Sequence, residues 1–201
     1  PLRNSKKLNL SCEEAMLYTF QEAKDKYGIK NFYIADDTLN ESNEKLELLA
    51  KVVSQLDYTP NLVAFARLDV LSRRPEQIPL LKKANLVGLN FGIETLSKEA
   101  AKGIRKGYDF EGFVKTLQTI RKEMPKCWIN GCFITGLIGD TKENTKSKLE
   151  LLLSKGLIDN VLMGELAIDS YEHTKDQILT YDEGWLSDMD KDPEKFGYKI
   201  N

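Results

Sequence analysis

Charged side chains that could bind a small polar ligand follow two short apolar runs in the first third of the sequence. Asp36 and Asp37 follow the first run, and two adjacent carboxylates could hold an ammonium group or a cation. Arg67 follows the second run, and its planar guanidinium suits the carboxylate of a ligand. Each group also has a purely structural explanation, because an aspartate can cap a turn and Arg67 can pair with Asp69. The residue types alone leave both explanations open.

A third polar position, Glu94, lies just beyond another apolar run and two residues after Gly92. A glycine lets a ligand approach the backbone, and a carboxylate beside it could accept hydrogen bonds from hydroxyl groups. The alternative is a glutamate in the first turn of a helix, where the helix dipole favours negative charge. This pair of residues is compatible with either interpretation.

Glycines recur through a later apolar run and its exit. Gly131 and Gly136 flank Ile134, and Gly139 follows. This spacing indicates the close approach of a flat or extended ligand. It is not a phosphate-binding loop of the Walker type, because no Gly-Lys-Ser/Thr follows. A tight turn before a helix would explain Gly139 but not Gly131.

Cysteine and histidine are too few and too scattered for a metal site or for a serine, histidine and aspartate triad. The chain has three cysteines, Cys12, Cys127 and Cys132, and one histidine, His173. Cys127 and Cys132 fall in one expected strand at an odd separation, so they should face opposite sides as buried thiols. We therefore assign no metal ligand and no catalytic residue from the sequence.

Helical and strand-like segments alternate along the chain. A helix begins at Ser11, where Glu14 completes a capping box, and ends at Gly28, while a later helix is capped by Asp140 and Glu143. Five runs are too continuously apolar to leave one face in water, so we expect them to form a parallel sheet. They span residues 31–35, 62–66, 86–91, 128–134 and 161–168. The fold class is α/β. The pattern does not separate a closed barrel from a doubly wound sheet, but both place ligands at the carboxyl ends of the strands.

The length and charge of the chain fit one domain that acts on neither nucleic acid nor membrane. There are 201 residues with a net charge of −2, which gives no electrostatic signature for a phosphate backbone or an anionic lipid surface. No apolar run approaches the ~20 residues that span a bilayer, so we expect a cytoplasmic location. The alternating pattern weakens near the end. We expect residues 1–173 to form the α/β domain and residues 174–201 a partly irregular extension.

The order and spacing of these motifs resemble those of radical S-adenosylmethionine (radical SAM) enzymes. The branch that contains methylthiotransferases and cobalamin-associated methyltransferases is the most similar. The resemblance covers residues 3–168 and rests on the segments 34–38, 66–71, 92–95, 105–107 and 131–141. It implies a partial TIM-type (β/α)6 barrel that lacks its first strand here. S-adenosylmethionine would lie across the carboxyl ends of the strands.

The resemblance also implies roles for individual residues. In the family, the loop after the second strand contacts the methionine part of S-adenosylmethionine, and two later strand ends add polar contacts. The glycine-bearing strand makes room for adenine. The implied ligand residues are Asp36 and Asp37 for methionine, Arg67 and Glu94 for polar contacts, and Gly131, Ile134 and Gly136 for adenine.

One family motif is absent from the sequence. The Cys-x3-Cys-x2-Cys loop that binds a [4Fe-4S] cluster does not occur, and the helix beginning at Ser11 resembles the first helix of the family. We therefore expect the cysteine loop upstream of Pro1 in an intact parent, which would generate a 5′-deoxyadenosyl radical with the help of an electron donor and act on an unknown substrate. The 201-residue chain alone should be inactive. The main alternative is a parallel α/β domain that binds a small molecule or acts as a scaffold, without redox chemistry. A hydrolase or aldolase barrel is disfavoured by the single histidine and the lack of a paired nucleophile and base.

Overall fold

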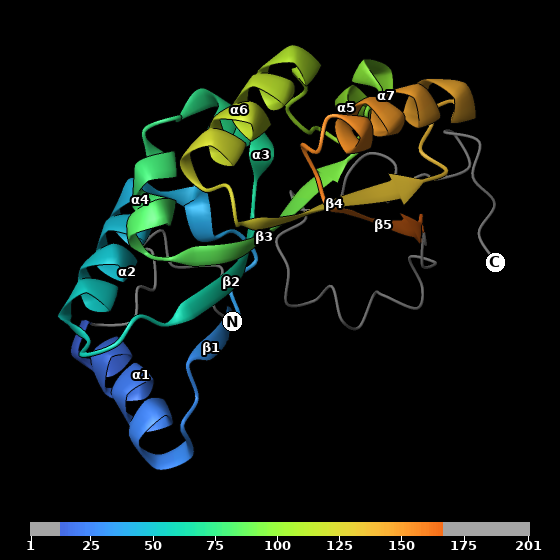
Figure 1. The fold of residues 1–201 in the computed structure, drawn as a ribbon. Helices are drawn as coiled ribbons and strands as arrows, with labels where there is room; N and C mark the ends of the chain where they lie inside the picture. Colours follow the sequence, from blue (N-terminus) through green and yellow to red (C-terminus); the bar gives the residue numbers. More distant parts are fainter. Residues whose placement is uncertain (1–12, 167–201) are drawn as a thin grey trace, which may run out of the picture.

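Residues 13–166 are described by the computed structural model, and they form five strands alternating with helices (Figure 1). The strands are β1 (Asn31–Ile34), β2 (Asn61–Ala66), β3 (Leu86–Glu94), β4 (Trp128–Thr135) and β5 (Asn160–Glu165). The helices are α1 (Glu13–Tyr27), the short 3-10 helix η1 (Leu39–Glu41), α2 (Asn43–Gln55), α3 (Leu68–Arg73), α4 (Gln77–Lys83), α5 (Lys98–Gly103), α6 (Phe110–Glu123) and α7 (Lys142–Ser154).

The sheet is parallel throughout, and its strands lie in sequence order β1-β2-β3-β4-β5. The helices cover one convex side of this curved sheet (Figure 1). A doubly wound sheet would reverse its strand order and carry helices on both faces, whereas a barrel adds each strand in the same direction. The predicted α/β fold with an open, partial barrel is therefore confirmed.

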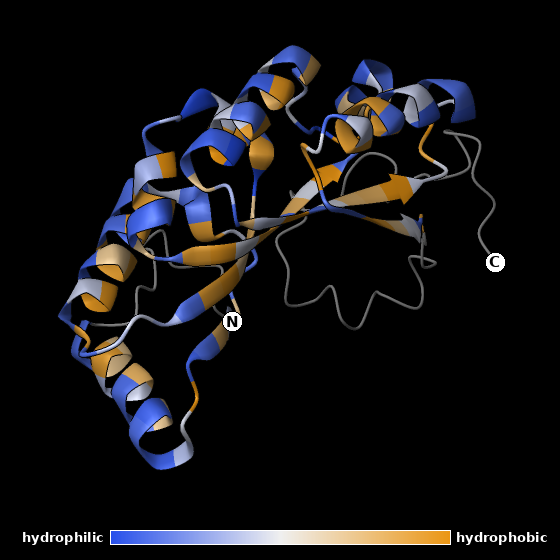
Figure 2. Cartoon of the chain, in the orientation of Figure 1, coloured by the Kyte–Doolittle hydropathy of each residue, from blue (hydrophilic) through white to orange (hydrophobic). Residues whose placement is uncertain are grey.

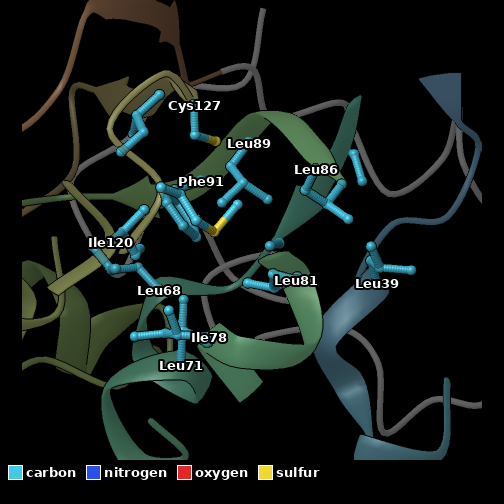
Figure 3. Packing of buried hydrophobic residues seen from close by; sticks show 14 of the residues in the cluster. Leu39, Leu68, Leu71, Ile78, Leu81, Leu86, Leu89, Phe91, Ile120 and Cys127 are labelled. Atoms are coloured by element: carbon cyan, nitrogen blue, oxygen red, sulfur yellow. The ribbon is translucent and has the colours of Figure 1, made fainter. Parts of the chain in front are cut away.

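The core lies between the sheet and the helices. Leu86, Leu89 and Phe91 of β3 point towards apolar side chains of the helices that cover this strand (Figure 3). The helical partners labelled in that view are Leu68, Leu71, Ile78, Leu81 and Ile120. The helices alternate hydrophilic and hydrophobic stretches along their length, and β2, β3 and β4 are largely hydrophobic (Figure 2). Burial of the apolar helix faces against the sheet fixes the strands whose ends carry the site.

The second face of the sheet differs from the expectation that no strand would have a face in water. Within residues 13–166 no helix covers this face, and apolar side chains on it are exposed: Tyr33 is 52% exposed, Trp128 55% and Leu162 61%. Tyr33 packs edge-on against Phe65 of the neighbouring strand, with ring centroids 5.9 Å apart. In a closed barrel this face is the interior, which explains why the strands are apolar on both faces.

Several local expectations were wrong. The short helices η1 and α3 were not predicted, because each is a single turn or two directly after a strand. Cys127 precedes β4 instead of lying in it, since Arg121 binds its carbonyl oxygen at 2.7 Å. Helix α7 is capped by Thr141, whose hydroxyl accepts from the backbone of Asn144, and not by Asp140. Asp140 instead accepts hydrogen bonds from two threonine hydroxyls.

Some expectations fall outside the described residues. These are the capping box at Ser11, Cys12, His173, the last residues of the fifth expected strand, and the boundary between 173 and 174. Among residues 13–166, no helix has the length and apolar character needed to cross a membrane.

Candidate functional site at the carboxyl ends of the strands

The end of β2 carries Arg67 in a fixed orientation. Its guanidinium binds the carboxylate of Asp69 with both prongs, Nε to Oδ1 at 3.0 Å and Nη2 to Oδ2 at 2.8 Å. Asp69 is buried and also accepts from Arg73 at 3.0 Å, while the Arg67 side chain keeps 40% of its surface exposed. The structural alternative, an ion pair with Asp69, is thus present. It holds the guanidinium in place and leaves part of it open to a ligand.

The end of β3 carries an ion pair between Glu94 and Lys106. Lys106 Nζ lies 2.8 Å from Glu94 Oε1, and the two side chains are 19% and 23% exposed. Glu94 has a positive φ of 67°, an uncommon conformation for a residue with a side chain. A Cβ atom on Gly92 would lie 2.6 Å from Glu94 Oε1, so Gly92 gives the carboxylate its place above the strand. The alternative interpretation, that Glu94 lies in the first turn of a helix, is therefore wrong.

Arg67 and Glu94 lie near each other across β2 and β3. Hydrogen bonding to Asp69 is the main cause that raises the pKa of Arg67, and the charges of Asp69 and Glu94 raise it further. Cys132 of β4 belongs to the same group: burial raises the pKa of its thiol, and the negative charge of Glu94 adds to that rise. The ends of β2 and β3, β4 and the segment after α5 thus bring Arg67, Glu94, Cys132 and Lys106 together.

Asp36 and Asp37 occupy the turn after β1. Asp36 accepts from the backbone of Thr38 at 2.9 Å, as a turn-capping aspartate does, and it also pairs with Lys45 Nζ at 2.9 Å. Its carboxylate is therefore engaged on both oxygens, and its side chain remains 31% exposed. Asp37 is exposed on the same turn. The structure places both residues at the carboxyl end of the sheet, and their predicted contact with methionine remains a prediction.

The glycine-bearing strand has two different environments. Gly131 is buried on the side of the helices, where a Cβ atom would lie 2.7 Å from the ring of Phe133. The room left by this glycine is therefore occupied by Phe133. Gly136 is exposed with a positive φ of 89°, and it lines with Ile134 an open pocket of about 440 Å³ beside α7. The predicted adenine contacts remain predictions.

Sequence reasoning missed two residues of the site. Lys106 lies in the segment 105–107 that contributed to the resemblance, so its position was noted although its pairing with Glu94 was not. Asn40 gave no signal, because a polar residue in a turn is ordinary. The structure buries Asn40 completely against the backbone of Arg67.

The residues present suit one of the two groups that the resemblance implies. Within residues 13–166, no group of three or more His, Cys, Asp or Glu side chains could hold a metal ion, so the described part does not supply ligands for an iron–sulfur cluster. A guanidinium and a carboxylate, both part-buried and part-exposed, match the charged groups of a methionine moiety. Because Gly92 has no side chain, the Glu94 carboxylate has room above the strand to reach such a ligand.

Comparison with known proteins decides the family. The family model of the radical SAM superfamily matches residues 9–152, which is most of the chain. The chain belongs to the radical SAM superfamily. The cofactors of this superfamily are S-adenosylmethionine and a [4Fe-4S] cluster, as the resemblance implied. No curated protein matches the sequence significantly.

Solved structures of radical SAM enzymes share the fold. Coproporphyrinogen III oxidase (HemN) from Escherichia coli superimposes with a TM-score of 0.55 at 16% identity, over 78% of this chain and 38% of that enzyme. The methyltransferase TsrM from Kitasatospora setae, with cobalamin and a [4Fe-4S] cluster bound, gives 0.55 at 16% identity, over 72% and 27%. The cobalamin-dependent enzyme OxsB, with aqua-cobalamin and S-adenosylmethionine bound, gives 0.60 at 15% identity, over 84% and 25%. The chain thus spans well under half of each of these structures, and the likeness concerns the fold.

Proposed function

We propose that this chain forms part of the S-adenosylmethionine-binding site of a radical SAM enzyme whose substrate is unknown. The observation that carries the proposal is the grouping of Arg67, Glu94 and Lys106 at one edge of the sheet, above Gly92. When bound, the [4Fe-4S] cluster supplies the electron that cleaves S-adenosylmethionine to a 5′-deoxyadenosyl radical. Residues 13–166 do not supply ligands for that cluster, and their part in the proposal is to bind and orient S-adenosylmethionine.

Each side chain has a distinct task in this proposal. The guanidinium of Arg67, held by Asp69, offers its exposed edge to the carboxylate of the methionine moiety. Glu94 accepts hydrogen bonds from the ligand while Lys106 holds the carboxylate in its orientation. Asp36 provides a further negative charge at the end of β1, where the ammonium group of methionine would be attracted. These groups bind and orient the ligand, and the cofactor performs the difficult chemistry.

The proposal extends to the location and partners of the enzyme. The enzyme would act in the cytoplasm, with an electron donor as partner and with neither nucleic acid nor membrane involved. The 201-residue chain alone would lack the cluster and the activity. Anaerobic reconstitution with iron and sulfide tests this point: an N-terminally extended chain should bind a [4Fe-4S] cluster, and this chain should not. A stoichiometric cluster on this chain alone contradicts the proposal.

The substitution Glu94→Ala tests the ligand site. In the cluster-loaded, N-terminally extended protein, we expect the affinity for S-adenosylmethionine, measured by equilibrium dialysis, to fall by about 1–3 kcal/mol, the usual loss for a hydrogen bond to a charged group. The midpoint of thermal unfolding should fall only modestly, because the side chains of Lys106 and Glu94, 19% and 23% exposed, both reach solvent.

Glu123→Ala is the matched control for this experiment. Glu123 forms an exposed ion pair with Lys82 at 3.2 Å, at the opposite end of the strands. It should change neither affinity nor stability appreciably. A large loss of stability in Glu94→Ala with unaltered affinity, or no saturable binding of S-adenosylmethionine to the cluster-loaded, N-terminally extended protein, would favour the scaffold alternative instead.

A further inference from the structure

A buried amide side chain forms hydrogen bonds with the backbone at the end of β2. Asn40 of η1 is 0% exposed, and its side chain makes two hydrogen bonds with one residue. Its Oδ1 accepts from the backbone N–H of Arg67 at 2.8 Å, and its Nδ2 donates to the carbonyl oxygen of Arg67 at 3.0 Å. A side-chain amide thus replaces the pair of ladder hydrogen bonds that a neighbouring strand would provide.

A second buried amide holds the first in this orientation. Gln77 of α4 is also 0% exposed, and its Oε1 accepts from Asn40 Nδ2 at 3.3 Å. Its Nε2 donates to the backbone oxygen of Asn40 at 3.3 Å and to Asn43 Oδ1 at 2.9 Å. Every buried side-chain nitrogen and oxygen in the described part of the chain has a partner. Since an unpaired amide at this depth is costly, the pair admits few other arrangements.

The residue that Asn40 binds, Arg67, is the one whose side chain reaches the candidate ligand site. Arg67 has an extended backbone, with φ −102° and ψ 117°, immediately before α3. Asn40 fixes this backbone, and Asp69 fixes the guanidinium at the other end of the side chain. A displacement of about 1 Å in a ligand-positioning group can cost two orders of magnitude in function. The direction of the guanidinium therefore depends on the two hydrogen bonds between the Asn40 side chain and the Arg67 backbone.

We propose that Asn40 is a positioning residue for S-adenosylmethionine, acting through the backbone of Arg67. It also joins the turn after β1 to the end of β2, because Asp36 caps the turn that leads into η1. This inference rests on the proposed function, since it requires Arg67 to contact the ligand.

A double-substitution cycle on ligand affinity tests the inference with the full chain and S-adenosylmethionine as the probe. Arg67→Met should weaken binding by tenfold or more, as expected for loss of a charge-assisted contact, about 1.4 kcal/mol or greater. Asn40→Ala should weaken binding by about tenfold when Arg67 is present and by less than about twofold when it is replaced by Met. Asn85→Ala is the control, because Asn85 also donates from its side-chain amide to a backbone oxygen, that of Pro60 at 2.8 Å, but lies before β3 at the opposite end of the strands from Arg67, and its loss should leave affinity unchanged.

The outcomes separate the inference from the proposed function. If Arg67→Met leaves affinity unchanged, the ligand site is misassigned and both proposals fail. If Arg67→Met weakens binding but Asn40→Ala lowers only the unfolding temperature, or weakens binding equally in both backgrounds, then Asn40 is structural and the inference alone is overturned. Should Asn40→Ala not fold, Asn40→Ser, which keeps one polar atom, takes its place in the cycle with the same expected pattern.

Discussion

The two ends of the parallel strands use their charged residues differently. At the amino end, Arg121 of α6 donates to the carbonyl oxygens of Gly156 at 2.8 Å and Cys127 at 2.7 Å, and to Asp159 Oδ2 at 2.7 Å. Asp159 Oδ2 also accepts from the backbone N–H of Ile129 at the start of β4. This guanidinium is bound to the chain itself on every side, and it ties α6 to the loops that precede β4 and β5.

At the carboxyl end, charges are bound mainly to other side chains. Arg67 pairs with Asp69, and Lys106 pairs with Glu94. Exposure does not separate the two ends, because Arg121 and Asp159 are 19% and 28% exposed while Lys106 and Glu94 are 19% and 23% exposed. A guanidinium that already binds two backbone oxygens and a carboxylate has fewer donors left for a ligand than one that binds a single carboxylate. This difference fits the proposed binding role of the carboxyl end and a stabilising role of the amino end, the arrangement expected of barrel folds.

Asp159→Ala should have the largest effect on stability. The change removes the acceptor of both Arg121 and the Ile129 N–H, and we expect the free energy of unfolding to fall by about 2–3 kcal/mol. Urea denaturation measures the loss, and equilibrium dialysis should show unchanged affinity for S-adenosylmethionine. Loss of affinity in the folded variant would contradict the assignment of this end to stability.

Two glycine substitutions sharpen the comparison within the sheet. In Gly131→Ala, the added methyl meets the buried ring of Phe133 at 2.7 Å, and the unfolding free energy should fall by about 1–3 kcal/mol with little change in affinity.

In Gly92→Ala, the methyl meets the end of the Glu94 side chain at 2.6 Å, which can move aside. This second change should cost little stability and weaken binding by about tenfold, or about 1.4 kcal/mol. Chemical denaturation measures the stability of both variants, and dialysis measures their affinity for S-adenosylmethionine. Equal changes in stability and affinity for the two variants would contradict the different roles assigned to the two glycines.

The smallest effect concerns the pH dependence of stability at the amino end. Burial raises the pKa of Cys127 from about 9 to about 11. As the pH rises, the thiol ionises first in the unfolded chain, which then binds fewer protons than the folded chain. Stability should therefore fall above about pH 8.5, by less than about 1 kcal/mol at about pH 9.5. Denaturation midpoints of Cys127→Ala should lack this part of the slope, and an identical slope in the variant would show that Cys127 is not its cause.

Much of the fold was predictable because it depends on local pattern. The apolar runs gave all five strands, and the sheet was expected to be parallel because the runs were separated by helices. The short helices η1 and α3 escaped prediction, since a single turn has too few positions to show a helical period. Thr141 and Asp140 both suit a helix cap, and only the threonine hydroxyls around Asp140 decided between them.

The candidate site was predictable by residue but not by contact. Its polar residues could be named because they follow strands, and parallel strands end at one edge of a sheet. Pairing could not be named: Arg67 with Asp69 was one of two options, while Glu94 with Lys106 and Asn40 with Arg67 were not foreseen. Partners from different β/α units are brought together only when the units pack.

The sequence by itself determined the superfamily and the α/β alternation, because both are written in the order of residues along the chain. Only the tertiary structure decided that Gly131 faces Phe133 while Gly92 faces Glu94. It also decided that the amide of Asn40 replaces a strand neighbour for Arg67. The physical reason is that a side chain's surroundings depend on the face of the strand and on the register between strands, which are set by packing of the whole sheet against its helices.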